Sequence, residues 1–119
     1  MRIPKGSSSR SLPSQYTTKE LKLAEARQAS AREDLARGRA SVARARAAIT
    51  RGRETLVRRA KAGELEPVLA PIRANFDAAE AALDAALERL NAADTRLAAA
   101  QRRLDEAREK ARDVDRSSP

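Results

Sequence analysis

The chain of 119 residues contains no cysteine, no histidine and no tryptophan, and its aromatic side chains are limited to Tyr16 and Phe76. Without cysteine it forms neither a disulfide nor a thiolate nucleophile, and without histidine it lacks the commonest general base. Cysteine and histidine are also the main ligands of structural zinc. The sequence therefore predicts neither a metal site nor a cofactor.

Motifs of catalysis are missing as well. The four glycines form neither a phosphate-binding loop nor a dinucleotide-binding fingerprint: Gly6, Gly38, Gly52 and Gly63. No serine, lysine or aspartate stands in a recognisable triad arrangement. The carboxylates stand among arginines on predicted helices, where solvated ion pairs are the ordinary explanation. We expect a protein that is not an enzyme and binds no small molecule.

Long apolar runs are absent too. No run approaches the 18 apolar residues of a membrane span, and residues 1–17 are basic without the apolar segment of a signal peptide. We expect no membrane contact and no secretion by a signal peptide. The expected location is the cytoplasm or a particle assembled there.

What the chain does contain is mainly alanine, leucine and arginine, a composition typical of long helices and coiled coils. Its net charge of +8 is unevenly placed: residues 1–64 hold 16 Lys+Arg and 6 Asp+Glu, whereas residues 65–119 hold 9 and 11. Within residues 35–61 nine basic residues accompany a single acid, Glu54. This concentration indicates a directed basic face.

The order of turn and helix signals predicts two helices of similar length. Residues 1–17, rich in serine and proline, read as an extended or disordered basic arm. A first helix over about 18–62, capped by Thr17 or Thr18 with Glu20, should end at Gly63. We place a turn at about 63–71, because it holds two prolines, then a second helix over about 72–115 and a frayed end at 117–119.

Both predicted helices repeat large and small apolar residues every seven positions. In the heptad notation, whose seven positions are lettered a to g, the large residues stand at position a and the small ones at position d. Leu35, Val42, Ile49 and Leu56 form the large series of the first helix, and a small residue follows each of the first three at position d. The second helix has the same order, with Leu or Phe at a and mostly Ala at d. The sequence therefore predicts an all-α, antiparallel two-helix coiled-coil hairpin over residues 18–116.

A register in which paired residue numbers sum to 135 sets large residues against small ones. It pairs Val42 with Ala93, Gly52 with Leu83 and Gly38 with Leu97, so that each glycine makes room for a leucine. Four flanking ion pairs would favour it: Arg53–Glu80, Arg39–Asp94, Glu25–Arg108 and Asp34–Arg103. Because a lone hairpin has a thin core, we expect further copies or a larger partner to complete it.

The first helix carries a second pattern, outside the predicted core. A row of arginines recurs at position c and borders a floor of small residues: Arg37, Arg44, Arg51 and Arg58, with Ala36, Ala40, Ala43 and Ala47. This face is a candidate surface for close packing against another helix, with guanidinium groups holding acidic groups of the partner. The alternative is a solvated face whose alanines serve helix propensity alone.

Nucleic acid is the second candidate partner of this face. The row from Arg37 to Arg58 spans 21 residues, or ~32 Å at 1.5 Å per residue, about one turn of duplex DNA. Nonspecific contact with phosphates is compatible with such a row, but the chain has no sequence-reading motif and few aromatics for stacking. Anionic membranes are disfavoured because the face offers alanine where membrane-binding helices carry bulky apolar residues.

We expect a structural or adaptor protein that packs into a multi-subunit assembly. The arm is by default a spacer; its alternative role is to fold onto a neighbouring subunit through four anchors: Lys5, Arg10, Leu12 and Tyr16. In composition and topology alone, the chain resembles the small Ala- and Arg-rich hairpins among phage scaffolding and virion accessory proteins. A phage virion or a similar particle is therefore the expected setting.

Overall fold

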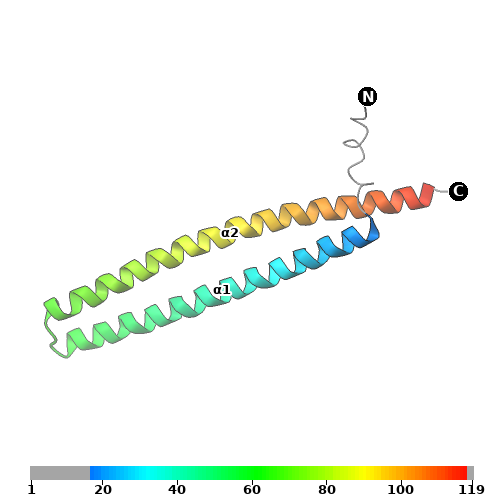
Figure 1. The fold of residues 1–119 in the computed structure, drawn as a ribbon. Helices are drawn as coiled ribbons and strands as arrows, with labels where there is room; N and C mark the ends of the chain where they lie inside the picture. Colours follow the sequence, from blue (N-terminus) through cyan, green and yellow to red (C-terminus); the bar gives the residue numbers. More distant parts are fainter. Residues whose placement is uncertain (1–16, 118–119) are drawn as a thin grey trace, which may run out of the picture. The chain divides into compact units, whose positions relative to one another are not determined.

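The computed structural model describes residues 17–117, which form two helices joined by a short connection (Figure 1). Helix α1 is Thr18–Lys61 and helix α2 is Glu66–Ser117. The predicted all-α antiparallel hairpin is confirmed, and α1 agrees closely with the predicted first helix. The arm anchors Lys5, Arg10, Leu12 and Tyr16 lie outside the described residues.

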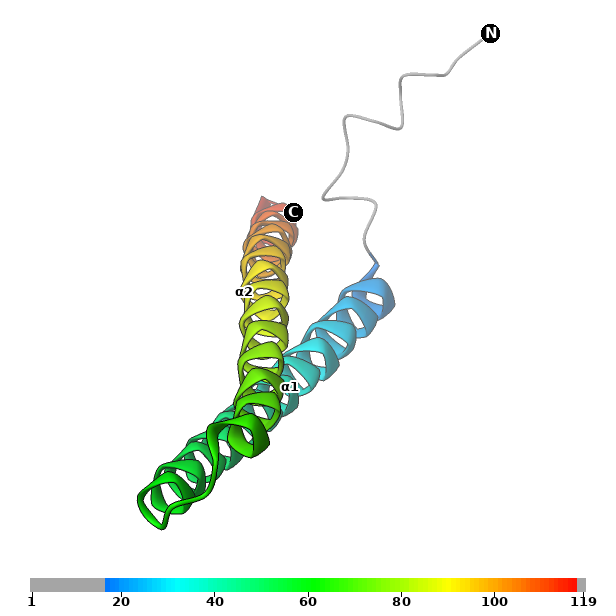
Figure 2. The same ribbon diagram turned by 90° about the vertical axis from the view of Figure 1, so that its left-hand side faces the viewer.

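The chain divides into two compact units, and each contains one segment of both helices. Unit 2 is the continuous stretch 34–93 and includes the connection between the helices. Unit 1 combines the described residues before position 34 with those from position 94 onward. Next to the connection, the α1 and α2 segments of unit 2 lie side by side in two perpendicular views (Figures 1 and 2).

A reciprocal capping box begins α1, as the sequence predicts for Thr17 and Glu20. The backbone N–H of Glu20 donates to Thr17 Oγ1 at 3.1 Å, and the backbone N–H of Thr17 donates to Glu20 Oε1 at 2.7 Å. These bonds satisfy two N–H groups that have no partner within a helix. The start of α1 is thus fixed by local sequence.

The end of α1 is a Schellman motif around Gly63. The Gly63 N–H donates to the carbonyl of Ala60 at 3.1 Å, and the Glu64 N–H donates to the carbonyl of Arg59 at 3.2 Å. This pair of bonds requires a left-handed residue at the position after the cap. Gly63 supplies it with a φ of 96°, which a residue without Cβ adopts at little cost.

The connection is shorter than the turn predicted over 63–71. Helix α2 begins at Glu66, so that both prolines belong to it. Pro67 lies in the first turn, where an N–H would have no partner within the helix, and proline is therefore tolerated there. Pro71 is accommodated inside the helix as well. The prolines shape the start of α2 and do not extend the turn.

The predicted apolar stripe of α1 is buried. Leu35, Val42, Ile49 and Leu56 are all buried, and so is Gln28 one heptad before Leu35. On α2 the side chain of Leu69 is fully enclosed, while Leu104 and Ala107 are buried in unit 1. The seven-residue period therefore identified the core-facing side of α1 correctly.

The predicted register is wrong by one heptad. In unit 2 a Cβ added at Gly38 would lie 2.9 Å from Cδ2 of Leu90, and one at Gly52 would overlap the ring of Phe76. These pairs sum to 128, whereas the prediction paired the two glycines with Leu97 and Leu83. The cause is the short connection, because α1 ends at Lys61 and α2 already begins at Glu66. Each α1 residue of unit 2 therefore faces an α2 residue seven positions earlier in the sequence than the predicted one.

Unit 1 has its own contacts between α1 and α2. The Gln28 side-chain amide donates to the carbonyl of Leu97 at 2.6 Å, so this buried amide has an acceptor. The predicted Glu25–Arg108 ion pair is present at 3.0 Å, and Arg32 donates to the Gln101 side chain at 3.2 Å. Polar contacts therefore line the flank of this unit as well as its core.

Candidate docking face

The residues predicted to contact a partner all lie on the α1 segment of unit 2. Every one of them is exposed: Ala36, Arg37, Ala40, Ala43, Arg44, Ala47, Arg51 and Arg58. They occupy helix positions away from the buried stripe, because that stripe recurs at positions 35, 42, 49 and 56. We call this set the Arg/Ala face. The structure thus leaves the whole face open to contact.

The arginines of the Arg/Ala face differ in what they bind. Arg37 forms an ion pair with Asp34 one turn earlier, and Arg58 donates to the hydroxyl of Thr55 at 3.1 Å. Arg44 and Arg51, at the centre of the row, form no ion pair or side-chain hydrogen bond with any residue of the range 17–117. The centre of the row therefore offers two uncompensated guanidinium groups.

A neighbouring arginine row faces α2 and is already engaged. Arg46 forms an ion pair with Asp84, and Arg53 donates to Asp77 at 2.8 Å and to Glu80 at 3.2 Å. Arg39 donates to the Asn91 side chain at 3.0 Å. Hydrogen bonding to Asp77 is the main reason that the pKa of Arg53 lies above its ordinary value. The predicted Arg53–Glu80 pair is thus present, with Asp77 as an additional acceptor.

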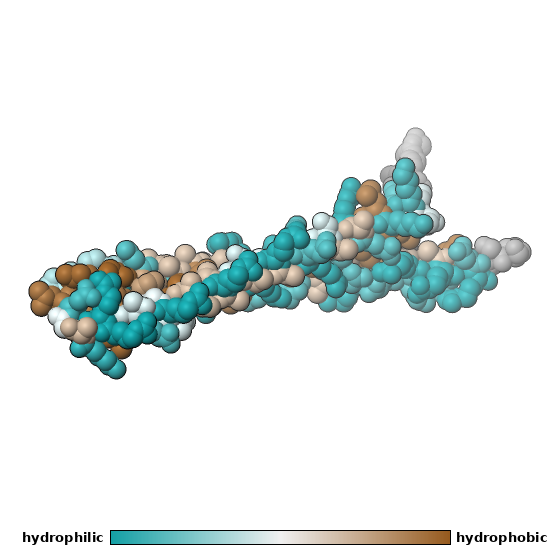
Figure 3. All heavy atoms as spheres, turned by 90° about the horizontal axis from the view of Figure 1, so that it is seen from below, coloured by the Kyte–Doolittle hydropathy of each residue, from teal (hydrophilic) through white to brown (hydrophobic). Residues whose placement is uncertain are grey.

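The charge of unit 2 is separated between its two helices. Residues 34–61 carry nine Lys+Arg and two Asp+Glu, whereas residues 66–93 carry two and five. The acids of α2 thus compensate only part of the charge of α1. A face view shows rows of hydrophilic residues beside weakly hydrophobic surface (Figure 3). The uncompensated charge remains available to an external anion.

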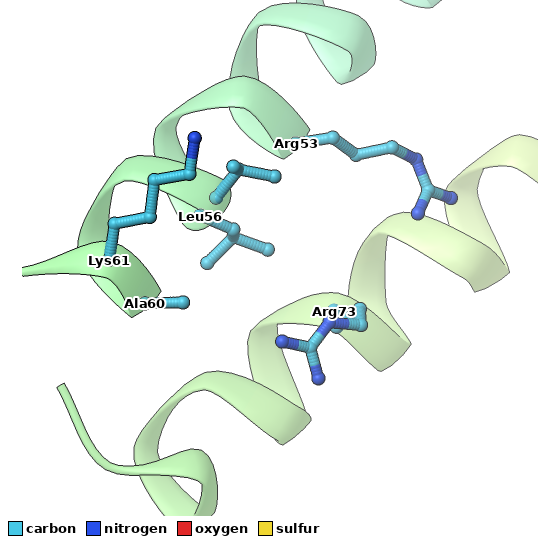
Figure 4. Close-up of a pocket in the computed structure, with 6 residues that line it drawn as sticks. Arg53, Leu56, Ala60, Lys61 and Arg73 are labelled. Atoms are coloured by element: carbon cyan, nitrogen blue, oxygen red, sulfur yellow. The ribbon is translucent and has the colours of Figure 1, made fainter. Parts of the chain in front are cut away.

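One feature of unit 2 is not among the predicted site residues. A hollow of about 390 Å³ opens next to the connection, and we call it the tip hollow; its lining consists of Arg53, Leu56, Val57, Ala60, Lys61 and Arg73 (Figure 4). The sequence does carry a signal for it. The arginines at positions 32, 39, 46 and 53 recur every seven residues, and the next position of this series is Ala60.

Unit 1 has a smaller hollow of about 280 Å³, lined by Ala24, Arg27, Gln28, Ala100, Arg103 and Leu104. Among the described residues, no three Asp or Glu side chains gather as a metal site would require. Neither α1 nor α2, within the part of the chain that the structure covers, has a stretch apolar enough to span a bilayer. The Arg/Ala face and the tip hollow are therefore the surfaces that we consider as binding sites.

Comparison with known proteins adds no further constraint on the site. No protein family, no curated protein and no solved structure gives a significant match to the chain.

Proposed function

We propose that this protein is a non-catalytic structural or adaptor component, and that its Arg/Ala face packs against a subunit of a larger assembly. The observation that carries the proposal is the pair Arg44 and Arg51, which are exposed and lack any counter-charge in the described chain, beside an exposed alanine floor. The setting we propose is a virion or a comparable particle that also contains further copies of the chain.

Two physical properties of the face support docking of an acidic helix. Alanine side chains let a second helix approach closely, because the distance between packed helices depends on the side chains at the contact. Guanidinium groups bind carboxylates through two parallel hydrogen bonds, which fix the orientation of the partner. The partner should therefore be a helix with small residues along its contact and carboxylates at its edges.

The test places a carboxylate in the alanine floor. Ala43→Glu should prevent the tagged full-length chain from co-sedimenting with its native assembly, because it adds bulk and like charge against an acidic partner. Ala74→Glu adds the same group at an exposed position of α2 and should leave co-sedimentation unchanged. If both variants co-sediment equally with the assembly, the Arg/Ala face is not part of the contact.

A second candidate is binding of a nucleic-acid backbone by the same face. The excess of basic charge favours it, since pairing two copies of a chain with net charge +8 doubles the charge and neutralises nothing. The spacing of the row also matches about one turn of duplex DNA, as the predicted helix already indicated.

The salt dependence of binding distinguishes the two candidates. If the face binds phosphates, the affinity for a fluorescein-labelled 20-base-pair duplex should fall log-linearly with salt. Arg44→Gln with Arg51→Gln should then reduce the slope by about 2, close to one per phosphate contact. Arg96→Gln with Arg102→Gln is the charge-matched control on α2. Equal slopes for the two double variants would exclude the nucleic-acid function of this face.

A further inference from the structure

The flank of unit 2 contains a gap in a regular series of contacts. Arg46 meets Asp84, and seven residues later Arg53 meets Asp77 and Glu80. After another seven residues the position is occupied by Ala60, which has no charged group to pair with α2. The tip hollow lies at this position and includes Ala60 in its lining.

The α2 residue in the lining of the hollow is Arg73, and it finds its acid elsewhere. Arg73 forms an ion pair with Glu66, one heptad earlier on its own helix. Hydrogen bonding to Glu66 raises the pKa of Arg73 above its ordinary value. The guanidinium groups of Arg53 and Arg73 therefore have different acidic partners and do not share one across the gap.

The lining combines positive charge with an apolar floor. Lys61 is exposed and forms no ion pair with any described residue, and no acidic side chain lines the hollow. The floor is aliphatic, and Val57 keeps 54% of its surface exposed. Figure 4 shows Arg53, Leu56, Ala60 and Lys61 coming from α1 and Arg73 from α2. A ligand with both a carboxylate and an aliphatic group would satisfy this lining.

We propose that the tip hollow docks a segment of another protein that presents a carboxylate beside an aliphatic side chain. The carboxylate pairs with Lys61, which has no acidic partner in the described chain, and the aliphatic group covers Val57. A volume of about 390 Å³ is near the lower end of ordinary ligand pockets, roughly 300–1,000 Å³, and suits one or two side chains.

The surroundings of the hollow favour a protein over a lipid surface. Strongly hydrophobic atoms do gather where the helices are joined (Figure 3), and Leu65 is exposed there. However, Glu64 and Glu66 flank Leu65 directly, and an anionic bilayer would repel both. A second copy docking tip to tip would set Lys61 against its own equivalent, which like-charge repulsion opposes.

The decisive variant fills the gap from within. Ala60→Glu places a carboxylate inside the hollow, beside Arg73 and Lys61, so that it can pair with either cation and occupy the space. We expect this variant to unfold at a temperature equal to or above that of the parent chain, so a loss of binding is not a loss of folding. Ala98→Glu adds the same group at an exposed position of α2, outside both the tip hollow and the Arg/Ala face, and is the matched control.

The probe is a phage-displayed library of random 12-residue peptides, selected on the full-length chain. The proposal expects enriched peptides that contain Asp or Glu next to Leu, Ile or Val. Measured by fluorescence polarisation, their affinity should fall at least tenfold in Ala60→Glu and stay within twofold in Ala98→Glu. Because the proposed function concerns the Arg/Ala face, its failure leaves this result unaffected.

Four results would overturn the proposal. Three concern the peptides: no enrichment at all, enriched peptides without a carboxylate, and equal binding by Ala60→Glu and the parent chain. In the fourth, Ala60→Glu keeps its peptide binding but loses self-association or binding to phosphatidylserine vesicles. The last would assign the hollow to a second copy or to a membrane. Lys61→Gln provides an independent check, since it should weaken peptide binding and reduce its dependence on salt.

Discussion

Gly52 lies against the ring of Phe76, so closely that a methyl group at residue 52 would overlap the ring. Gly38 has a different neighbour, because a Cβ there would meet the terminal methyl group Cδ2 of Leu90 at 2.9 Å. A leucine methyl moves away by a small rotation of its side chain, whereas an aromatic ring is rigid. The two helical glycines therefore differ in how well the neighbouring side chain could accommodate an added methyl group.

Alanine substitution should separate the two glycines. Alanine gains about 1 kcal/mol of helix propensity over glycine, and overpacking costs about 1–3 kcal/mol. Gly38→Ala should consequently be neutral or slightly stabilising, and Gly52→Ala should destabilise by up to about 2 kcal/mol. Urea unfolding followed by circular dichroism measures both. Equal effects of the two substitutions would contradict the close contact between Gly52 and Phe76.

The hairpin was predictable from the sequence because local signals determine it. Thr17 and Glu20 mark the start of α1, Gly63 marks its end, and the seven-residue period of Leu35 to Leu56 gives the buried side. The Arg/Ala face was predictable for the same reason. Its residues follow from the helical period once the buried stripe is known.

The register was not predictable from charge pairing. Arg53–Glu80 and Glu25–Arg108 were expected from the wrong register and are nevertheless present, because long side chains reach such partners in either alignment. The length of the connection determines the register. That length depends on whether Pro67 and Pro71 precede α2 or lie within it. The tip hollow escaped prediction because its lining combines α1 residues with Arg73 of α2, and which α2 residue lies there depends on the register.

Engineered cysteines give a direct test of the register. The natural chain has no cysteine, so a pair of introduced residues is free of competition. Val42→Cys with Ala86→Cys, which sum to 128, should form an intramolecular disulfide under mild oxidation. Val42→Cys with Ala93→Cys should not, since seven residues displace the partner by ~10.5 Å along the helix, beyond the reach of a disulfide. Free-thiol titration of oxidised monomers distinguishes the two pairs. A disulfide in the second pair alone would show that the register with sum 135 is the correct one.

The left-handed conformation of Gly63 makes a separate prediction. Any residue with a Cβ is strained at a φ of 96°, so Gly63→Ala should destabilise the hairpin by about 1–2 kcal/mol. No atom outside the neighbouring residues lies within 4 Å of a Cβ built there, so that the cost is conformational and not a clash. Thermal unfolding by calorimetry measures it. Ala62→Gly is the control at the preceding position and should have a smaller effect.

The two acids beside the connection make stability depend on pH. Hydrogen bonds from Arg59 and Arg73 lower the pKa values of Glu64 and Glu66, respectively, below the ordinary value of 4.5. The folded chain therefore binds fewer protons at these groups than the unfolded chain does. Their contribution is fully present above pH 4.5 and is lost as the pH falls through the lowered values.

Removing both carboxylates tests this linkage. Glu64→Gln with Glu66→Gln should unfold at a lower temperature than the parent chain at pH 7. The difference should shrink as the pH is lowered below 4.5, because the parent then loses the same charges. Glu33→Gln with Glu54→Gln is the charge-matched control, since neither carboxylate forms an ion pair with any described residue. A temperature difference that stays constant from pH 7 to pH 2 would show that the ion pairs with Arg59 and Arg73 do not stabilise the hairpin.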